Sequence, residues 1–376
     1  MRSTFLNFLT RTFIKHLLLT IIFGICIFAC VNSNEITKKK ETRFITDMNN
    51  RVVEIPVKIN KVVAHRSGAL RMVCYLEAAE LIIGIEANER RRNVPYLYAY
   101  PELKKLPLIG SGNFADPELI LLLQPDVIIC TYLNKGEADE LQTKSGIPVV
   151  CLDYGDFNEK KENFYTSLRL LGEVLDKSDR AKFLINYIET EFEQIKAKCR
   201  KKNSNTKVYV GGIAFRGSHG INSTEPKYAP FRYTNAKNVA KPLTNNPNLS
   251  PSKLNNIIID KEQIIEWNPD KIFIDVSGYT LSKPDFEKQS ILGKLLPAVQ
   301  KDEIYFLLPH IWNTINYENI LINTIFIAKV LYPELYKDID FVTEANKIYQ
   351  IFLGKPLYKD LQKLYGLGCQ KITEDE

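Results

Sequence analysis

Residues 116–130 read DPELILLLQPDVIIC, and residues 260–274 read DKEQIIEWNPDKIFI. The second stretch repeats the first at an offset of 144 residues (260 − 116). In each copy an aspartate precedes a short helical pattern and a glutamate follows two residues later, which is typical of an N-cap and a first-turn acid. Pro125 and Pro269 end the helix, and an apolar run then predicts a buried strand. Two such units, too far apart for a solenoid, predict two similar lobes.

Apolar strand patterns alternate with helical segments on both sides of these stretches. Strands are expected at 61–65, 81–86, 126–132, 148–154, 271–276 and 303–308, with a further strand from Lys207 that the glycines at 211, 212 and 217 follow, and helices are expected at 69–76, 137–145 and 314–331. Strands that alternate with helices form mostly parallel sheets covered by helices. The sequence therefore predicts an α/β protein of two similar lobes with mostly parallel sheets.

One long helix is expected between the two copies of the repeat. Residues 178–201 carry an apolar stripe at helical spacing, formed by Ala181, Leu184, Ile188, Phe192, Ile195 and Cys199. Its length and position favour a rigid connector over an ordinary surface helix. The predicted division is a leader at 1–29, a tether at 30–41, an N-terminal lobe at 42–177, the connecting helix at 178–202 and a C-terminal lobe at 203–376.

The N-terminus has the pattern of an export signal. Arg2, Arg11 and Lys15 precede an apolar run at 17–29, which is too short to span a bilayer comfortably. The run ends in Ile-Phe-Ala-Cys and resembles a bacterial lipoprotein signal, in which Cys30 becomes the lipidated first residue. An uncleaved anchor is the alternative, and both readings place the remaining chain outside the cytoplasmic membrane.

Charge and cysteine content exclude several classes of protein. The chain has 50 Lys and Arg against 44 Asp and Glu, and loss of the leader's three basic residues leaves 47 against 44. This small excess gives no support for a nucleic-acid partner. The chain has seven cysteines, of which Cys26 lies in the leader and Cys30 at its end. The other five are scattered and contain no C-x-x-C pair, so no disulfide framework is predicted. Cys130 and Cys151 are expected to be small buried hydrophobes.

Candidate ligand-binding residues follow the predicted strands, because open α/β sheets bind ligands beyond the carboxyl ends of their strands. They are His65, Arg66, Ser67, Arg71, Arg90, Tyr132, Phe215, Arg216, His219, His310 and Trp312. Arginines together with aromatic side chains suit a bulky anionic ligand. No metal ligand is assigned, although neutral imidazoles of His65, His219 and His310 could coordinate a metal centre directly.

A family resemblance covers nearly the whole mature chain. Beyond the two repeats, it is carried by RFITDMNNRVVEIPVKINKVVAHRSGALRMVCYL at 43–76, GIEANERR at 84–91, GIPVVCLDYG at 146–155 and GKPLYKDL at 354–361. The chain resembles the substrate-binding lipoproteins of ABC importers for iron–siderophore, haem and cobalamin. The resemblance implies two lobes joined by one long helix, a ligand cleft between them, small lobe motion and no intrinsic cofactor. It also implies an ABC permease dimer and its ATPase as partners.

The resemblance gives a role to the repeated glutamates. In the family, one glutamate on each lobe docks into arginine pockets of the permease dimer, and Glu118 and Glu262 occupy the matching positions. From the residues alone, both would merely favour the helix dipole.

The expected function is capture of an anionic metal chelate, most readily a ferric siderophore, for delivery to the permease. A small oxyanion such as molybdate or tungstate would need the arginines but not the aromatic side chains. Cobalamin would need the aromatic side chains but little positive charge. A metal-storage or signalling lipoprotein is the alternative from another class. An enzyme is not expected, since neither G-x-S-x-G nor H-E-x-x-H occurs.

Overall fold

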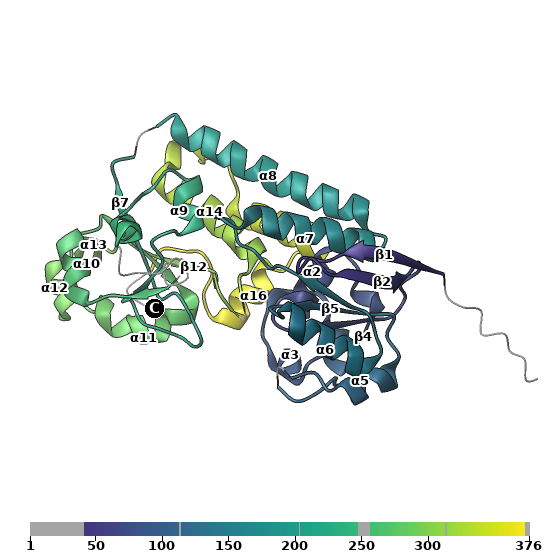
Figure 1. Cartoon of the computed structure of the whole chain (residues 1–376). Helices are drawn as coiled ribbons and strands as arrows, with labels where there is room; N and C mark the ends of the chain where they lie inside the picture. The colour runs from purple at the N-terminus through teal and green to yellow at the C-terminus, as the bar shows by residue number, and fades with distance from the viewer. Residues whose placement is uncertain (1–40, 113, 203, 247–255, 313, 373–376) are drawn as a thin grey trace, which may run out of the picture. The chain divides into compact units, whose positions relative to one another are not determined.

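Two four-stranded parallel sheets carry the fold, one before and one after the long helix in the chain. The first has the order β4-β3-β5-β6, formed by Ile82–Gly84, Val62–His65, Val127–Thr131 and Val149–Leu152. The second has the order β12-β11-β7-β9, formed by Ile304–Leu307, Lys271–Asp275, Lys207–Gly211 and Lys237–Asn238. The computed structural model (Figure 1) describes residues 41–112, 114–202, 204–246, 256–312 and 314–372. The predicted α/β class with two parallel sheets is confirmed.

Both copies of the repeat form the predicted helix–proline–strand unit. Helix α5 (Pro117–Leu123) leads into β5, and α10 (Lys261–Trp267) leads into β11. Each helix ends at a residue in the left-handed region, with φ of 52° at Gln124 and 45° at Asn268, directly before the proline. Asp116 caps α5 by accepting two backbone N–H groups of the first turn, whereas Asp260 lies at the N-cap of α10 without such a bond.

The aspartate after each proline attaches the unit to the neighbouring strand. The Asp126 carboxylate accepts the backbone N–H groups of Asn60 at 2.8 Å and Lys61 at 3.0 Å, at the start of β3. In the second sheet, the Asp270 carboxylate accepts the N–H of Lys207 at 2.7 Å, at the start of β7. These bonds tie the start of β5 to β3 and the start of β11 to β7, the two central strands of each sheet. Asp126 is buried and needs such donors, whereas Asp270 is exposed.

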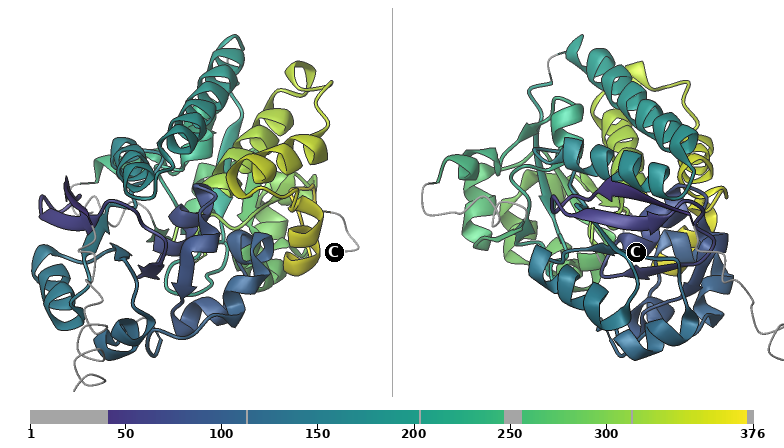
Figure 2. Two further views of the ribbon diagram at one scale, coloured as in Figure 1. Left: turned by 90° about the vertical axis from the view of Figure 1, so that its right-hand side faces the viewer. Right: turned by 45° about the vertical axis from the view of Figure 1, so that its right-hand side comes forward.

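The long helix α8 spans Ser178–Arg200 and lies beside α7 (Lys161–Val174) in all views (Figures 1 and 2). Its buried face includes the predicted stripe from Ala181 to Cys199 and adds Ile185. The other helices are α2 (Ala69–Tyr75), α3 (Ala87–Arg91), α4 (Pro95–Ala99), α6 (Lys135–Ser145), α9 (Ala229–Tyr233), α11 (Tyr279–Phe286), α12 (Ile291–Leu295), α13 (Pro297–Gln300), α14 (Tyr317–Leu331), α15 (Phe341–Leu353) and α16 (Tyr358–Tyr365). Two short pairs complete the strands, β1 (Thr42–Thr46) with β2 (Val52–Pro56), and β8 (Ser223–Thr224) with β10 (Ile257–Ile258).

Helix α14 starts three residues later than the sequence predicts. The expected start was Thr314, but this residue has φ of 103°, which a β-branched side chain tolerates poorly and a helix excludes. The helix begins at Tyr317 with Asn316 at its N-cap. Residues 314–316 therefore belong to the loop that follows β12.

One hydrophobic core joins both sheets. It contains Val127 and Ile129 of the first sheet together with Val208 and Phe273 of the second. Helix α14 packs against α8 and α9, while α15 packs against α2 and α4, so C-terminal helices also cover the N-terminal sheet. Residues 43–376 form one compact unit by their contacts. The lobe boundaries at 42–177, 178–202 and 203–376 remain predictions.

Within the described ranges, no helix combines the length and apolar character needed to cross a membrane. The leader, Cys30 and the tether lie outside the described residues.

Candidate functional site

A cavity of about 1240 Å³ opens where strands of both sheets end. Its walls come from segments that follow β3, β5 and β6 in the first sheet and β7 and β12 in the second. The lining residues are Arg66, Ser67, Tyr132, Asp153, Gly155, Asp156, Glu159, Lys160, Ala214, Phe215, Arg216, Gly217, Ser218, Ile311, Trp312, Thr314 and Ile315. The carboxyl ends of parallel strands are where ligands bind in open α/β sheets, so this cavity is the candidate binding site.

Three aromatic side chains in the cavity wall are unusually open to solvent. The exposed fractions are 60% for Tyr132, 47% for Phe215 and 37% for Trp312. Large apolar side chains normally lose most of their accessible surface on folding. Aromatic surface left open inside a cavity favours contact with the flat or apolar part of a ligand.

The cavity wall contains several residues in the left-handed backbone region that glycine normally occupies. The φ angles are 70° at Arg66, 56° at Tyr132, 54° at Arg216 and 103° at Thr314. Such conformations cost free energy in non-glycine residues and cluster at ligand-binding positions. Two of these residues meet: the hydroxyls of Tyr132 and Thr314 lie 2.9 Å apart and connect the loops after β5 and β12.

The lining carries three cationic and three acidic side chains. Within the described part of the chain, Arg66, Lys160 and Arg216 have no carboxylate partner, and the Arg66 Nε atom is buried without a hydrogen bond. The acids are held by the protein itself. Glu159 pairs with Lys227 at 2.5 Å, while Asp153 and Asp156 accept backbone N–H groups of their own loop. The cations are therefore the charges available to a ligand.

Arg71, predicted to contact the ligand, lies behind the wall. Its side chain is fully buried, and its guanidinium donates to Tyr154 Oη at 2.9 Å, to the Trp312 carbonyl at 3.3 Å and to the Ile315 carbonyl. Tyr154 Oη donates to the same Ile315 carbonyl at 2.8 Å. Burial keeps Arg71 from the cavity, and its donors instead hold the loop that contributes Trp312 and Ile315 to the wall.

Two of the three predicted histidines are also buried behind the wall, each against a glutamate. His65 Nδ1 lies 2.7 Å from Glu86 Oε1, and His310 Nε2 lies 2.9 Å from Glu225 Oε2. Burial lowers the pKa of His310, but the charge and proximity of Glu225 raise it, and the net shift is upward. The third, His219, is half-buried and its Nε2 lies 2.8 Å from the Phe215 carbonyl.

The structure thus brings together six of the eleven predicted ligand-binding residues: Arg66, Ser67, Tyr132, Phe215, Arg216 and Trp312. His65, Arg71, Arg90, His219 and His310 are not among the lining residues. Arg90 lies on α3, where its guanidinium donates to the Leu106 carbonyl at 2.6 Å. Within the described residues, no group of three or more His, Cys, Asp and Glu side chains could hold a metal ion.

Sequence reasoning missed the loop after β6, which supplies Asp153, Asp156, Glu159 and Lys160 to the wall. The sequence could have indicated this loop, because it follows the strand predicted at 148–154, and ligands bind beyond the carboxyl ends of such strands. Thr314 and Ile315 were missed because they had been assigned to the first turn of a helix.

Comparisons with known proteins agree with this architecture. The family model described as Periplasmic binding protein matches residues 67–310. Molybdate-binding protein MolA of Haemophilus influenzae is 25% identical over 350 residues, covering 86% of this chain and 94% of that protein. Petrobactin-binding protein YclQ of Bacillus subtilis is 22% identical over 305 residues, covering 79% of this chain and 91% of that protein.

Two solved structures share the fold. MolA bound to molybdate superposes with a TM-score of 0.64 at 21% sequence identity, covering 84% of this chain and 98% of that one. The YclQ structure gives a TM-score of 0.56 at 19% identity, covering 80% of this chain and 100% of that one. Together with the matched family model, which spans more than half of the sequence, these likenesses identify the chain: it belongs to the periplasmic binding protein family, as an extracytoplasmic substrate-binding protein of an ABC transporter and not an enzyme.

Proposed function

We propose that the protein captures an anionic metal chelate, of the ferric siderophore kind, and delivers it to an ABC permease dimer and its ATPase. The main support is that a large cavity contains three cationic side chains, those of Arg66, Lys160 and Arg216. Within the described residues, none of the three is paired with a carboxylate. Arg66 comes from the first sheet and Arg216 from the segment after β7, so a ligand between them meets positive charge from both sides. Planar guanidinium groups suit carboxylate, catecholate or phosphate oxygens.

Size and apolar surface support a chelate rather than a bare oxyanion. A cavity of about 1240 Å³ exceeds the roughly 300–1,000 Å³ of ordinary small-molecule pockets, whereas a tetrahedral oxyanion would fill only a small part of it. Tyr132, Phe215 and Trp312 offer aromatic surface that an oxyanion cannot use but an organic chelator can. The likeness to petrobactin-binding YclQ points the same way.

Molybdate is the second candidate, because MolA is 25% identical over most of both chains. The same unpaired cations would serve a dianion. Cobalamin is disfavoured, since it needs aromatic contacts but little positive charge.

The discriminating experiment titrates the wild type, Arg216→Ala and Trp312→Ala against ferric chelates, molybdate and cobalamin. Loss of a charged hydrogen bond typically costs about 1.5–3 kcal/mol, so Arg216→Ala should weaken ferric chelate binding roughly tenfold or more. Trp312→Ala should weaken chelate binding too. Molybdate binding indifferent to Trp312 would move the function to oxyanion uptake, and tight cobalamin binding indifferent to Arg216 would refute the anionic chelate.

We further propose that Glu118 and Glu262 dock the protein onto the permease. Both side chains are exposed and stand in the first turn of α5 and α10, the two copies of the repeat. An exposed pair of charges guides orientation and association more than it supplies affinity.

Lipid anchoring through Cys30 is proposed from the sequence alone. Cys30→Ser should release the protein from the membrane fraction or leave an uncleaved precursor. Metabolic labelling with a fatty acid tests this directly, since an unchanged label after the substitution would contradict the anchor.

A further inference from the structure

Two buried thiols face each other in the first sheet. Cys130 on β5 and Cys151 on β6 are directly paired in the parallel register, and their Sγ atoms lie 3.4 Å apart. Directly opposed residues on neighbouring strands send their side chains to the same face, which brings the two sulfurs together. Both residues are free cysteines with exposed fractions of 0% and 2%.

The other described cysteines lack a sulfur partner. Cys199 Sγ lies 3.7 Å from Tyr336 Oη, and Cys369 Sγ lies 3.4 Å from Asn323 Oδ1. Cys74 is buried on α2. Among the described cysteines, the pair on β5 and β6 is therefore the one placed for a sulfur–sulfur bond, and the other three serve as internal controls.

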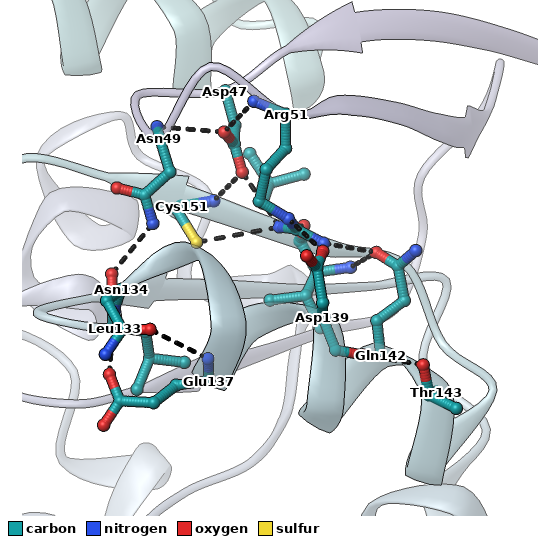
Figure 3. A network of polar contacts seen from close by, with 12 residues as sticks. Asp47, Asn49, Arg51, Leu133, Asn134, Glu137, Asp139, Gln142, Thr143 and Cys151 are labelled. Carbon is teal, nitrogen blue, oxygen red and sulfur yellow. Dashed lines mark hydrogen bonds and ion pairs between the residues drawn. The ribbon is translucent and has the colours of Figure 1, made fainter.

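A buried cation stands next to the pair, supplied by the turn between β1 and β2 (Figure 3). The Arg51 guanidinium lies 3.7 Å from Cys151 Sγ and is held by Asp47 at 2.9 Å and by the Val149 carbonyl at 2.8 Å. Positive charge beside a sulfur stabilises negative charge that develops there during thiol exchange. On the other sulfur, the hydrogen bond with Cys151 and burial raise the pKa of Cys130. The two thiols thus differ in their surroundings, because the Arg51 guanidinium, itself paired with Asp47 and Asp139, lies beside Cys151.

We propose that Cys130 and Cys151 are a disulfide site, oxidised outside the cytoplasmic membrane by a dithiol–disulfide oxidoreductase or a small-molecule disulfide. The Cys151 thiolate attacks one sulfur of the oxidant's disulfide, forms a mixed disulfide and releases one oxidant thiolate. Cys130 gives up its proton and displaces the second oxidant thiolate from the mixed disulfide. Two S–H bonds are lost, one S–S bond forms, and the oxidant leaves as two thiols that carry the two protons.

Exchange at the two buried sulfurs requires β6 to separate from the turn between β1 and β2, whose Met48 N–H donates to the Cys151 carbonyl at 3.0 Å and whose Asp47 carboxylate accepts the Cys151 N–H at 3.2 Å. β6 is the outer strand in the order β4-β3-β5-β6. An outer strand opens, or docks last during folding, without disrupting the centre of the sheet. The family acts outside the cytoplasmic membrane, where oxidants for thiols are available.

Oxidation at this place would act on the binding cavity. Cys130 lies two residues before Tyr132, and Cys151 lies two residues before Asp153, and both of these later residues line the cavity. A bond between the strands fixes their separation directly behind that wall. It also closes a loop of about 20 residues, which restricts the unfolded chain and favours the folded one.

The first test maps the thiols of the full chain, exported from a bacterial host through its own leader and quenched in acid before alkylation. Peptide mass spectrometry should find one cross-linked species joining the peptides of Cys130 and Cys151, with Cys74, Cys199 and Cys369 alkylated. The second test incubates the reduced protein with oxidised glutathione in mild urea, which is added to favour opening of the outer strand. Two thiols per chain should disappear, and the melting temperature should rise by a few degrees.

Matched variants keep the outcome decisive. Cys74→Ala should still lose two thiols, while Cys130→Ala and Cys151→Ala should lose none and show no rise in melting temperature. Alanine in place of serine avoids an unpaired hydroxyl in the core, so both variants should fold. Full alkylation of Cys130 and Cys151 in the exported protein and after glutathione treatment would overturn the proposal, as would a cross-link through any other cysteine.

Discussion

The guanidinium of Arg71 illustrates how single charged residues act on the cavity without entering it. Moving a cation into the protein interior costs free energy, which is recovered only when acceptors surround it. Tyr154 Oη and the carbonyls of Trp312 and Ile315 supply those acceptors. Glu318, fully buried on α14, contributes a nearby negative charge. Arg71 therefore couples the shape of the cavity wall to the stability of the interior.

Arg71→Leu should lower the free energy of unfolding by about 1–3 kcal/mol, because it removes buried hydrogen bonds to the Trp312 and Ile315 carbonyls and a positive charge near the buried Glu318 carboxylate. Urea denaturation measures the loss. Arg90→Leu is the control, since the Arg90 side chain is exposed and should change stability little. Equal effects of the two substitutions would show that Arg71 has no structural role of this kind.

His310 makes stability depend on pH. Its pKa lies above the ordinary value because Glu225, and to a lesser extent Asp275, outweigh burial. A base whose pKa is raised by folding stabilises the protein fully below its ordinary pKa of about 6.5 and loses that contribution as pH rises through the folded pKa. Burial also raises the pKa of Asp275 to about 6. The loss of stability that Asp275 causes as pH rises therefore occurs at lower pH, between about pH 4 and 6.

The melting temperature should therefore fall as pH is raised above about 6.5. The double variant His310→Gln, Glu225→Gln removes both charges while keeping similar shape, and it should flatten the curve in that window. Scanning calorimetry between pH 6 and 9 compares the two proteins. An identical slope in the double variant would assign the pH dependence to other groups.

At the scale of elements, the repeated helix–proline–strand unit shows what a sequence can and cannot reveal. Its prolines and apolar runs predicted both helices and both strands, because these signals act locally, and the alternation of strands with helices along the chain predicted the parallel sheets. The loop residues Arg66, Tyr132 and Arg216 followed from strand ends. Burial of His65 and His310 could not be predicted, since it depends on Glu86 and Glu225, which are 21 and 85 residues away (86 − 65 and 310 − 225).

The two copies offer a matched test of helix capping. Asp116 accepts N–H groups of α5 at 2.9 and 3.3 Å, whereas Asp260 makes no side-chain cap bond to α10. Asp116→Ala should therefore cost about 1 kcal/mol of stability, and Asp260→Ala should cost clearly less. Urea denaturation of the two variants, side by side, checks the difference. A larger loss at Asp260 would contradict the capping geometry.

At the scale of the whole molecule, the two proposed docking residues are separate from the cavity. Glu118 lies on α5, which leads into the first sheet, and Glu262 on α10, which leads into the second, and neither residue lines the cavity. Glu118→Arg or Glu262→Arg should abolish uptake, because each reverses a charge that would meet an arginine pocket, while ligand affinity stays unchanged. Transport into cells or vesicles and ligand titration measure the two quantities separately. Glu137→Arg, an exposed first-turn change on α6, is the control and should transport normally. A parallel loss of affinity and uptake would refute the docking role.

The hydrophobic core that both sheets share affects how ligand-free and ligand-bound copies of the protein would compete for the transporter. Helices α14 and α15 and the aromatic side chains around Tyr317 leave little freedom for one half to swing against the other. With docking through Glu118 and Glu262, an empty copy would then present nearly the same face as a loaded one. Empty copies would compete for the permease, so uptake would follow the ratio of loaded to empty protein, and overproducing the protein at scarce ligand would slow import.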